Sequence, residues 1–350
     1  MKDSTRLALL AATLASCDRG APTALPRVEE APAFVAPGPA RARQADAVRQ
    51  NDACVACHPR EAAEWLGSLH QRANIEPAYR RAFAIEPMPF CRSCHAPEAD
   101  PFEAPTHDVS ALGVGCVTCH VTGDTILSTT DDAPHAAPHA VLRDVRFERS
   151  EACGGCHQFR FPNRHGDEPW DFMQTTVREH AASKHAETSC AECHMPLNDD
   201  GSRSHRFESS RDFSKLRRAL EVRATRASGA RVTIELRLRN VGHAFPTGDL
   251  FRRVEVLVEA YGDDNAVVAS DRRYLARHFE LTPRGRALAR DDRITDDGST
   301  IEFDLGEVSR PFPIAYRVAY QRVAHPTGSD DVAAVLEADV VLSEGVLETH

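Results

Sequence analysis

The sequence has almost no cysteine to spare for disulfide bridges. Of its 11 cysteines, ten fall into one repeated pattern and only Cys17 lies outside it. A disulfide framework is therefore excluded as the source of stability. The apolar run of residues 7–15 is too short to cross a bilayer, so it predicts no membrane span. A formal net charge of −10 argues against a nucleic-acid partner.

The repeated pattern is Cys-x-x-Cys-His, the attachment signature of c-type haem. Two thiols one helical turn apart meet the two vinyl groups of a porphyrin, and the next histidine supplies the proximal nitrogen to iron. Zinc knuckles also use paired cysteines, but they need no histidine directly after each second cysteine. Chance gives about 0.02 copies in this composition. The five copies predict five covalent haems, held through Cys54, Cys57 and His58; Cys91, Cys94 and His95; Cys116, Cys119 and His120; Cys153, Cys156 and His157; and Cys190, Cys193 and His194.

Residues 1–17 predict a lipoprotein-type signal peptide. Lys2 and Arg6 precede the apolar run, and Leu14-Ala-Ser-Cys17 resembles a lipobox, in which Cys17 is lipidated. The alternative is ordinary cleavage that leaves a stray thiol. Lipidation predicts a periplasmic protein anchored to a membrane. Asp18 favours the inner membrane over the outer membrane or the cell surface.

Residues 18–50 are rich in proline and alanine and predict a semi-rigid tether. The five motifs then occupy residues 51–215, with first cysteines 37, 25, 37 and 37 residues apart. This leaves about 33 residues for each haem, too few for an ordinary side-chain core. We therefore expect an α/loop cytochrome c domain with little regular sheet, in which closely packed porphyrins form most of the core. Such packing is what electron conduction requires.

Histidine greatly outnumbers methionine as a source of second axial ligands, which predicts mostly bis-histidine, low-spin haems. His70 is the strongest candidate, at the end of a helix expected from Pro59. Twelve residues of helix separate it from His58 by about 18 Å, so it must serve a different haem. The other distal candidates are His139, His205, His107 and His243. On a helix expected over residues 169–187, His180 and His185 are explained equally well by ligation or by burial.

From residue 216 the pattern changes to period-two alternation, as in Val232, Ile234, Leu236 and Leu238. Further alternating segments lie around residues 254–258, 301–305, 314–320 and 335–342. These predict an all-β domain over residues 216–350, an Ig-like sandwich of about seven strands. The loop Asn240–Gly248 contains His243, which either shapes a turn or reaches the haems.

Residues 51–207 resemble the multihaem cytochromes of the cytochrome c-554 family. The resemblance rests on Trp65-x-x-Ser-x-His70, on Gly113-Val-Gly-Cys116 and on Cys193-His-Met-Pro196. It implies a mainly helical, loop-rich haem domain, stacked and angled haem pairs, and bis-histidine ligation with His70 distal. The chain departs from the family by its fifth motif and its C-terminal β domain.

The sequence predicts a periplasmic, membrane-tethered electron-transfer protein rather than an enzyme with its own substrate. We expect its partner to be a redox protein or a quinol-linked membrane complex. The alternative is an oxidoreductase acting on nitrite, hydroxylamine or a similar small nitrogen compound at one five-coordinate haem. The Cys-x-x-Cys-Lys motif of ammonia-forming nitrite reductases is missing, and Tyr79 is the one tyrosine in the haem stretch. A third hypothesis makes the β domain a binding module and the haems redox sensors.

Overall fold

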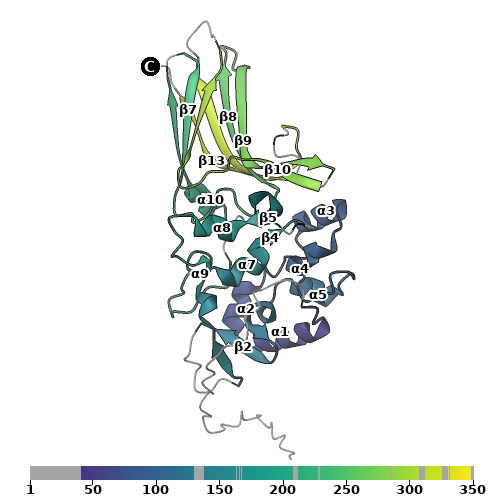
Figure 1. The fold of residues 1–350 in the computed structure, drawn as a ribbon. Coiled ribbons are helices and arrows are strands. Elements are labelled where there is room, and N and C mark those ends of the chain that lie inside the picture. Colours follow the sequence, from purple (N-terminus) through teal and green to yellow (C-terminus); the bar gives the residue numbers. More distant parts are fainter. Residues whose placement is uncertain are drawn as a thin grey trace, which may run out of the picture.

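A computed structural model describes residues 41–129, 138–162, 164, 166, 168–207, 212–227, 229–283, 285–306, 312–324, 330 and 332–347. Short helices and loops form one end of the molecule and long antiparallel strands form the other (Figure 1). The expected signal peptide with Cys17, the tether up to residue 40, and His135, His165, His325 and His350 lie outside the described residues. Within them, no helix is both long and apolar enough to cross a membrane.

Short helices dominate the haem-motif region, as the motif spacing predicts. They are α1 (Ala45–Cys57), α2 (Pro59–Trp65), α3 (Pro77–Ile85), α4 (Arg92–His95), α5 (His107–Leu112), α6 (Cys116–His120), α7 (Glu151–His157), α8 (Thr176–Ala181), α9 (Cys190–His194) and α10 (Phe213–Ala219), with 3-10 turns η1 (Pro89–Cys91), η2 (Val145–Glu148) and η3 (Pro169–Asp171). Sheet is limited to β1 (Val121–Thr122), β2 (Thr125–Ser128) and β3 (Val141–Arg143), and to β4 (Gln158–Arg160) paired with β5 (Phe172–Thr175).

The structure corrects three of the expected elements. Helix α1 begins at Ala45, inside the range expected to be tether, and Ala47 is fully buried. Helix α2 ends at Trp65, because Gly67 adopts a left-handed φ of 81°, so His70 follows a turn rather than a continued helix. The helix expected over residues 169–187 is wrong: η3, β5 and the six-residue α8 occupy that range.

The sheet-rich C-terminal region contains two antiparallel sheets. One has the order β10-β9-β8-β12-β13 and the other β11-β7-β6. The strands are β6 (Leu220–Arg226), β7 (Arg231–Leu238), β8 (Arg252–Tyr261), β9 (Val267–Thr282), β10 (Gly285–Asp291), β11 (Ser299–Asp304), β12 (Ile314–Val323) and β13 (Leu336–Leu347). The alternating segments of the sequence therefore form strands. Eight strands are described where about seven were expected, and the Ig-like plan stays a prediction.

One apolar cluster joins the two sheets. Val232, Ile234 and Leu236 of β7 and Val254 and Val256 of β8 all belong to it and are at most 1% exposed. Period-two alternation turns these side chains to one face of each sheet, so the two faces can share a core.

The haem-motif region has a much smaller side-chain core. Its two buried apolar clusters contain four and three residues among those described, against the 22 of the cluster between the sheets. This agrees with the expectation that another apolar group forms most of the core there.

Gly113 shows how tightly the chain packs beside His70. Its φ is 56°, and a Cβ there would lie 2.2 Å from the Gln71 oxygen and 2.6 Å from the His70 oxygen. Val114, the next residue, donates its N–H to the same His70 oxygen at 2.9 Å. Only glycine fits this approach of two backbone segments.

We therefore predict that Gly113→Ala destabilises the protein more than Gly123→Ala does. Gly123 has a similar φ of 57° but open space around its Cβ position. G123A should cost about 1–2 kcal/mol for the left-handed backbone. G113A should add about 1–3 kcal/mol for the overlap. Denaturant unfolding of both variants measures the difference, and equal losses would contradict the close packing.

Candidate haem sites

Each cysteine motif lies at the C-terminal end of a short helix. Helices α4, α6, α7 and α9 end at the motif histidine, and α1 ends at Cys57, with His58 as its C-cap. One helical turn separates the two cysteines, so both thiols project from the same side of the helix. The five motifs therefore have the local geometry that two thioether bonds to one porphyrin edge require.

The thiols of different motifs lie close to one another. Cys94 lies close enough to Cys156, and Cys153 close enough to Cys190, for the pKa of each thiol to depend on the other. Burial raises the pKa of Cys119 to about 11 in the chain without haem. The fourth motif therefore lies next to both the second and the fifth motif.

Four pairs of histidine rings face one another across similar gaps. Within each pair, one histidine belongs to a motif and the other comes from a distant segment. The pairs and their ring-centroid distances are His58–His139 at 6.3 Å, His157–His70 at 6.2 Å, His120–His205 at 6.2 Å and His194–His243 at 6.4 Å. Each distal partner was one of the five candidates taken from the sequence.

These distances fit an iron atom held between two imidazoles. Two metal–nitrogen bonds of about 2.0 Å, with about 1.1 Å from each nitrogen to its ring centre, give about 6.2 Å. Stacked rings in contact stand closer, as Tyr79 and His95 do at 3.9 Å, whereas tilted ring pairs such as Phe90–Phe159 stand at 6.2 Å. The spacing therefore leaves room for an iron atom between the two rings of each pair.

The hydrogen bonds of the rings also fit ligation. Nδ1 of His120, His205 and His243 lies 2.9 Å from a backbone carbonyl oxygen, that of Leu127, Arg203 and Ala244 respectively. In metal sites the second ring nitrogen commonly donates to such a carbonyl, which leaves Nε2 for the metal. His70 and His139 differ, because Nδ1 of each is buried without a hydrogen-bond partner.

Burial keeps both histidines of the His157–His70 pair neutral. It lowers the pKa of His70 to about 3, helped by the charges of His157 and His194. It also lowers the pKa of His157 to about 4. A neutral imidazole has a lone pair to offer a metal, so both rings can act as ligands throughout the physiological pH range.

The sequence segments that carry the family resemblance pack against each other around His70. The indole nitrogen of Trp65 donates to the Val114 oxygen at 2.9 Å, and Gln71 donates to Ala111. With the Val114–His70 backbone bond, these contacts fix the turn that follows α2. This explains why His70 can face the fourth motif, although α2 ends before it.

Other histidines do not fit a distal role. His107 lies on α5 with its side chain 93% exposed and bonded to Asp108, so the structure removes it from the distal candidates. Both ring nitrogens of His180 are used, by Ser150 and by Thr188. Asp292 and Asp330 likewise occupy both nitrogens of His278. These rings have a structural role, and burial explains His180 better than ligation.

His95 is the motif histidine that faces no other histidine ring among the described residues. Its Nδ1 lies 2.8 Å from the Ala73 oxygen, as expected for a ligand, and Tyr79 stacks on its ring. The Tyr79 hydroxyl is buried without a hydrogen-bond partner, and burial raises its pKa.

A family model and a solved structure are similar to this chain. Residues 53–121 match the family model described as cytochrome c554 and c-prime. These residues contain the first three motifs and His70. The chain is a multihaem c-type cytochrome. The resemblance to the cytochrome c-554 family is therefore confirmed, and with it the covalent attachment of haem.

The fold of this cytochrome is similar to the crystal structure of a penta-heme cytochrome c552 from Thermochromatium tepidum. The TM-score is 0.68 at 18% sequence identity, over 88% of this chain and 99% of that chain. A superoxide reductase (neelaredoxin) from Archaeoglobus fulgidus matches 39% of this chain and 95% of its own at 14% identity, but its TM-score of 0.21 carries no argument. No curated protein matches the cytochrome.

Phe207 is a site residue that the sequence analysis missed. Its ring stands edge-on to His70 at 4.2 Å and to His205 at 5.9 Å, so it lies between two histidine pairs. Its φ of 51° is unusual for a residue with a bulky side chain. The one available signal was its place two residues after His205, in a segment without regular structure.

We predict that Phe207 orients the His70 and His205 imidazole planes in this cytochrome. Phe207→Leu should shift the g-values of two low-spin EPR signals and leave the others unchanged, because the edge-on contacts are lost. Phe207→Tyr keeps the ring and should restore the wild-type spectrum. Phe102→Leu is the control, since Phe102 is 81% exposed. An F207L spectrum identical to that of F102L would contradict the role.

Proposed function

We propose that the chain is a pentahaem electron-transfer protein of the periplasm, tethered to a membrane by a lipidated Cys17. Electrons pass along closely packed, mostly bis-histidine haems to or from a redox protein or a quinol-linked membrane complex. The four facing histidine pairs carry this proposal. Each haem at such a pair has both axial positions filled, which favours electron transfer over binding of a substrate to iron.

The contacts between sites support one continuous path. Motifs two, four and five meet through their thiols, and Phe207 lies between the His70 and His205 pairs. The charge of His58 also acts on His120, which places the first site near the third. Haem supplies the one-electron chemistry, and the chain supplies ligands, spacing and an apolar surrounding.

The C-terminal region contributes directly to one site. His243 lies in the loop before β8, and its ring is nearly parallel to that of His194, at an interplanar angle of 9°. Its segment packs on the haem-motif region, where Gly242 approaches the Cβ of His185. The β domain therefore completes the fifth haem site. This role favours a domain that belongs to the electron path over one that serves only as a separate binding module.

The function as an oxidoreductase on a small nitrogen compound has no support from the comparisons. This function requires an iron without a distal ligand. The haem held by His95 is where this requirement is tested, because His95 faces no second histidine among the described residues. A high-spin ferric EPR signal from the oxidised wild-type protein would favour this second function, whereas five low-spin signals would favour electron transfer alone.

Replacing His243 tests the assignment of ligands. His243→Ala should convert one low-spin signal to high-spin and leave the remaining signals in place, because one iron loses its distal nitrogen. His278→Ala is the matched control: this histidine is also buried in the C-terminal region, but two carboxylates occupy its ring nitrogens. The mass of the purified protein should show five haems in both variants. An unchanged H243A spectrum would exclude His243 as a ligand.

Membrane attachment has its own test. Cys17→Ser removes the thiol that a lipobox requires, so the protein should move from the membrane to the soluble periplasmic fraction. Haem content should stay unchanged, because Cys17 belongs to no motif. Retention of the variant in the membrane fraction would show that lipidation is not the anchor.

A further inference from the structure

The side-chain amide of Gln174 lies behind the motif histidine His157. Its nitrogen is 3.1 Å from Nδ1 of His157 and 3.2 Å from the Thr176 hydroxyl oxygen. The antiparallel pairing of β4 with β5 explains this position, because Gln174 lies opposite Phe159, two residues after His157. Gln174 is 8% exposed, so the contact is shielded from water.

This side-chain contact distinguishes His157 from two other motif histidines. Nδ1 of His95 and Nδ1 of His120 each lie beside a backbone oxygen, which no substitution removes. The hydrogen bond from the second ring nitrogen of a metal-bound histidine raises the basicity of the ligand. At His157 this hydrogen bond therefore depends on the side chain at position 174.

Two threonine hydroxyls connect Gln174 to a carboxylate. The hydroxyl oxygens of Thr176 and Thr247 are 2.9 Å apart, and Thr247 donates to Glu179 at 2.5 Å. Thr175 donates to the other carboxylate oxygen of Glu179. The Glu179 side chain is 11% exposed. Gln174 is therefore one end of a polar network that holds its amide in place.

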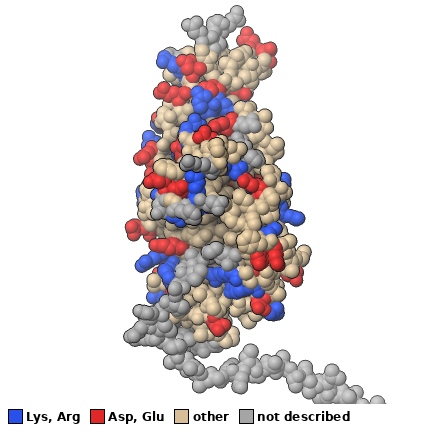
Figure 2. All heavy atoms as spheres, turned by 45° about the vertical axis from the view of Figure 1, so that its right-hand side comes forward, with Lys and Arg blue, Asp and Glu red and all other residues tan. Residues whose placement is uncertain are grey.

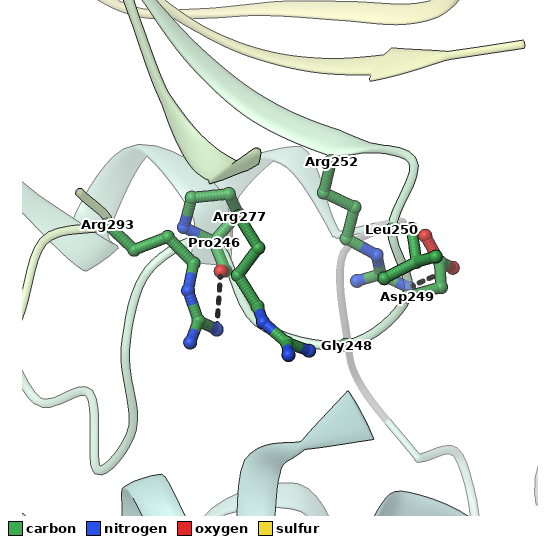
Figure 3. A pocket seen from close by; sticks show the side chains of 7 residues that line it. All are labelled: Pro246, Gly248, Asp249, Leu250, Arg252, Arg277 and Arg293. Carbon is green, nitrogen blue, oxygen red and sulfur yellow. Dashed lines mark hydrogen bonds and ion pairs between the residues drawn. The ribbon is translucent and has the colours of Figure 1, made fainter. Parts of the chain in front are cut away.

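Arg293 fixes the other end of this network. Its guanidinium pairs with Glu179 at 2.7 Å. It also donates to the backbone oxygen of Pro246 at 3.4 Å, the contact that a dashed line marks in Figure 3. Pro246 precedes Thr247 in the loop that carries His243. The network is therefore anchored in the C-terminal region, and its first member contacts a haem ligand.

The fourth motif lies among three others. Cys156 is close to Cys94 of the second motif, and Cys153 is close to Cys190 of the fifth. The charge of Cys119, in the third motif, also acts on Cys156. A change in the reduction potential of the fourth haem therefore affects electron transfer in several directions.

Surface charges act on the haems in a different way. On the face shown in Figure 2, acidic and basic side chains are interspersed. Water and salt screen such exposed charges. A hydrogen bond to an iron ligand acts on the metal through the ligand itself, so it escapes this screening.

We propose that Gln174 is a positioning residue of the fourth haem, and that its hydrogen bond with His157 adjusts the reduction potential of that haem. The inference deepens the proposed function and rests on it, because it requires iron between His157 and His70. Iron at Nε2 of His157 leaves the proton on Nδ1, which then donates. We expect the Gln174 amide to accept through its oxygen after a half-turn, since its two ends are nearly alike in size.

Four variants of the haem-loaded protein test this role. Gln174→Met keeps the length of the side chain and removes the amide acceptor, whereas Gln174→Glu supplies a charged and stronger acceptor. Gln158→Glu is the matched control, because it adds the same charge beside His157 on a side chain that accepts from the Arg178 backbone instead. His70→Ala identifies the EPR signal of this haem, since it removes the ring that faces His157.

The midpoint potential of this haem should move in opposite directions in the two Gln174 variants. Q174M should raise it, because a less basic imidazole stabilises ferric iron less. Q174E should lower it by more than Q158E does, and should shift the g-values of the same low-spin EPR signal. A merely structural role predicts shifts of one sign in Q174M and Q174E, because both would loosen the site.

Haem content and thermal unfolding of every variant are measured first. A Q174M protein with the wild-type potential and g-values, or a Q174E protein that matches Q158E, would overturn the role of Gln174. If Q174M does not fold, the comparison of Q174E with Q158E decides by itself. An H70A protein that retains every low-spin signal of the wild type would instead contradict the bis-histidine site of the proposed function, and this inference with it.

Discussion

The structure depends on a constraint set by the cysteine motifs. The histidine of a motif occupies one face of a haem, so the ligand for the other face must come from a distant part of the chain. The pairs His58–His139, His157–His70, His120–His205 and His194–His243 meet this constraint at nearly equal spacing. In each, the local motif supplies one ring and the tertiary fold supplies the second. A bond through iron would then join segments that share few side-chain contacts.

This arrangement explains why the haem-motif region folds with so small an apolar cluster of its own. Its helices are short, and several contain little more than one motif. Glycine and backbone contacts take over where side chains are few, as at Gly113 beside His70. We infer that attached haem and the protein chain stabilise each other, and that neither would hold this shape alone.

The C-terminal sheets have an ordinary apolar core between them, but they also lie against the haem-motif region. The loop before β8 brings His243 beside His194, and Asp249, Arg252 and Arg322 act on the surroundings of His95 and His157. Buried charges near a haem alter its reduction potential. Under the proposed function, the β domain therefore belongs to the redox machinery as well as to the scaffold.

The sequence by itself determined the cofactor, since covalent attachment chemistry requires a local spacing that can be read directly from Cys54 to His194. It also located five of the eight strands described in the C-terminal region, because alternation of apolar residues is local to each strand. Distal ligands were predictable only as a set of candidates, in which His107 stood beside His70 with nothing in the spacing to separate them. The tertiary structure decided between them: a distal ring must approach from across a gap of about 6 Å, and only the path of the chain in space brings it there. The bend after Trp65 and the position of Phe207 depend on contacts between segments far apart in the sequence, which no local pattern records.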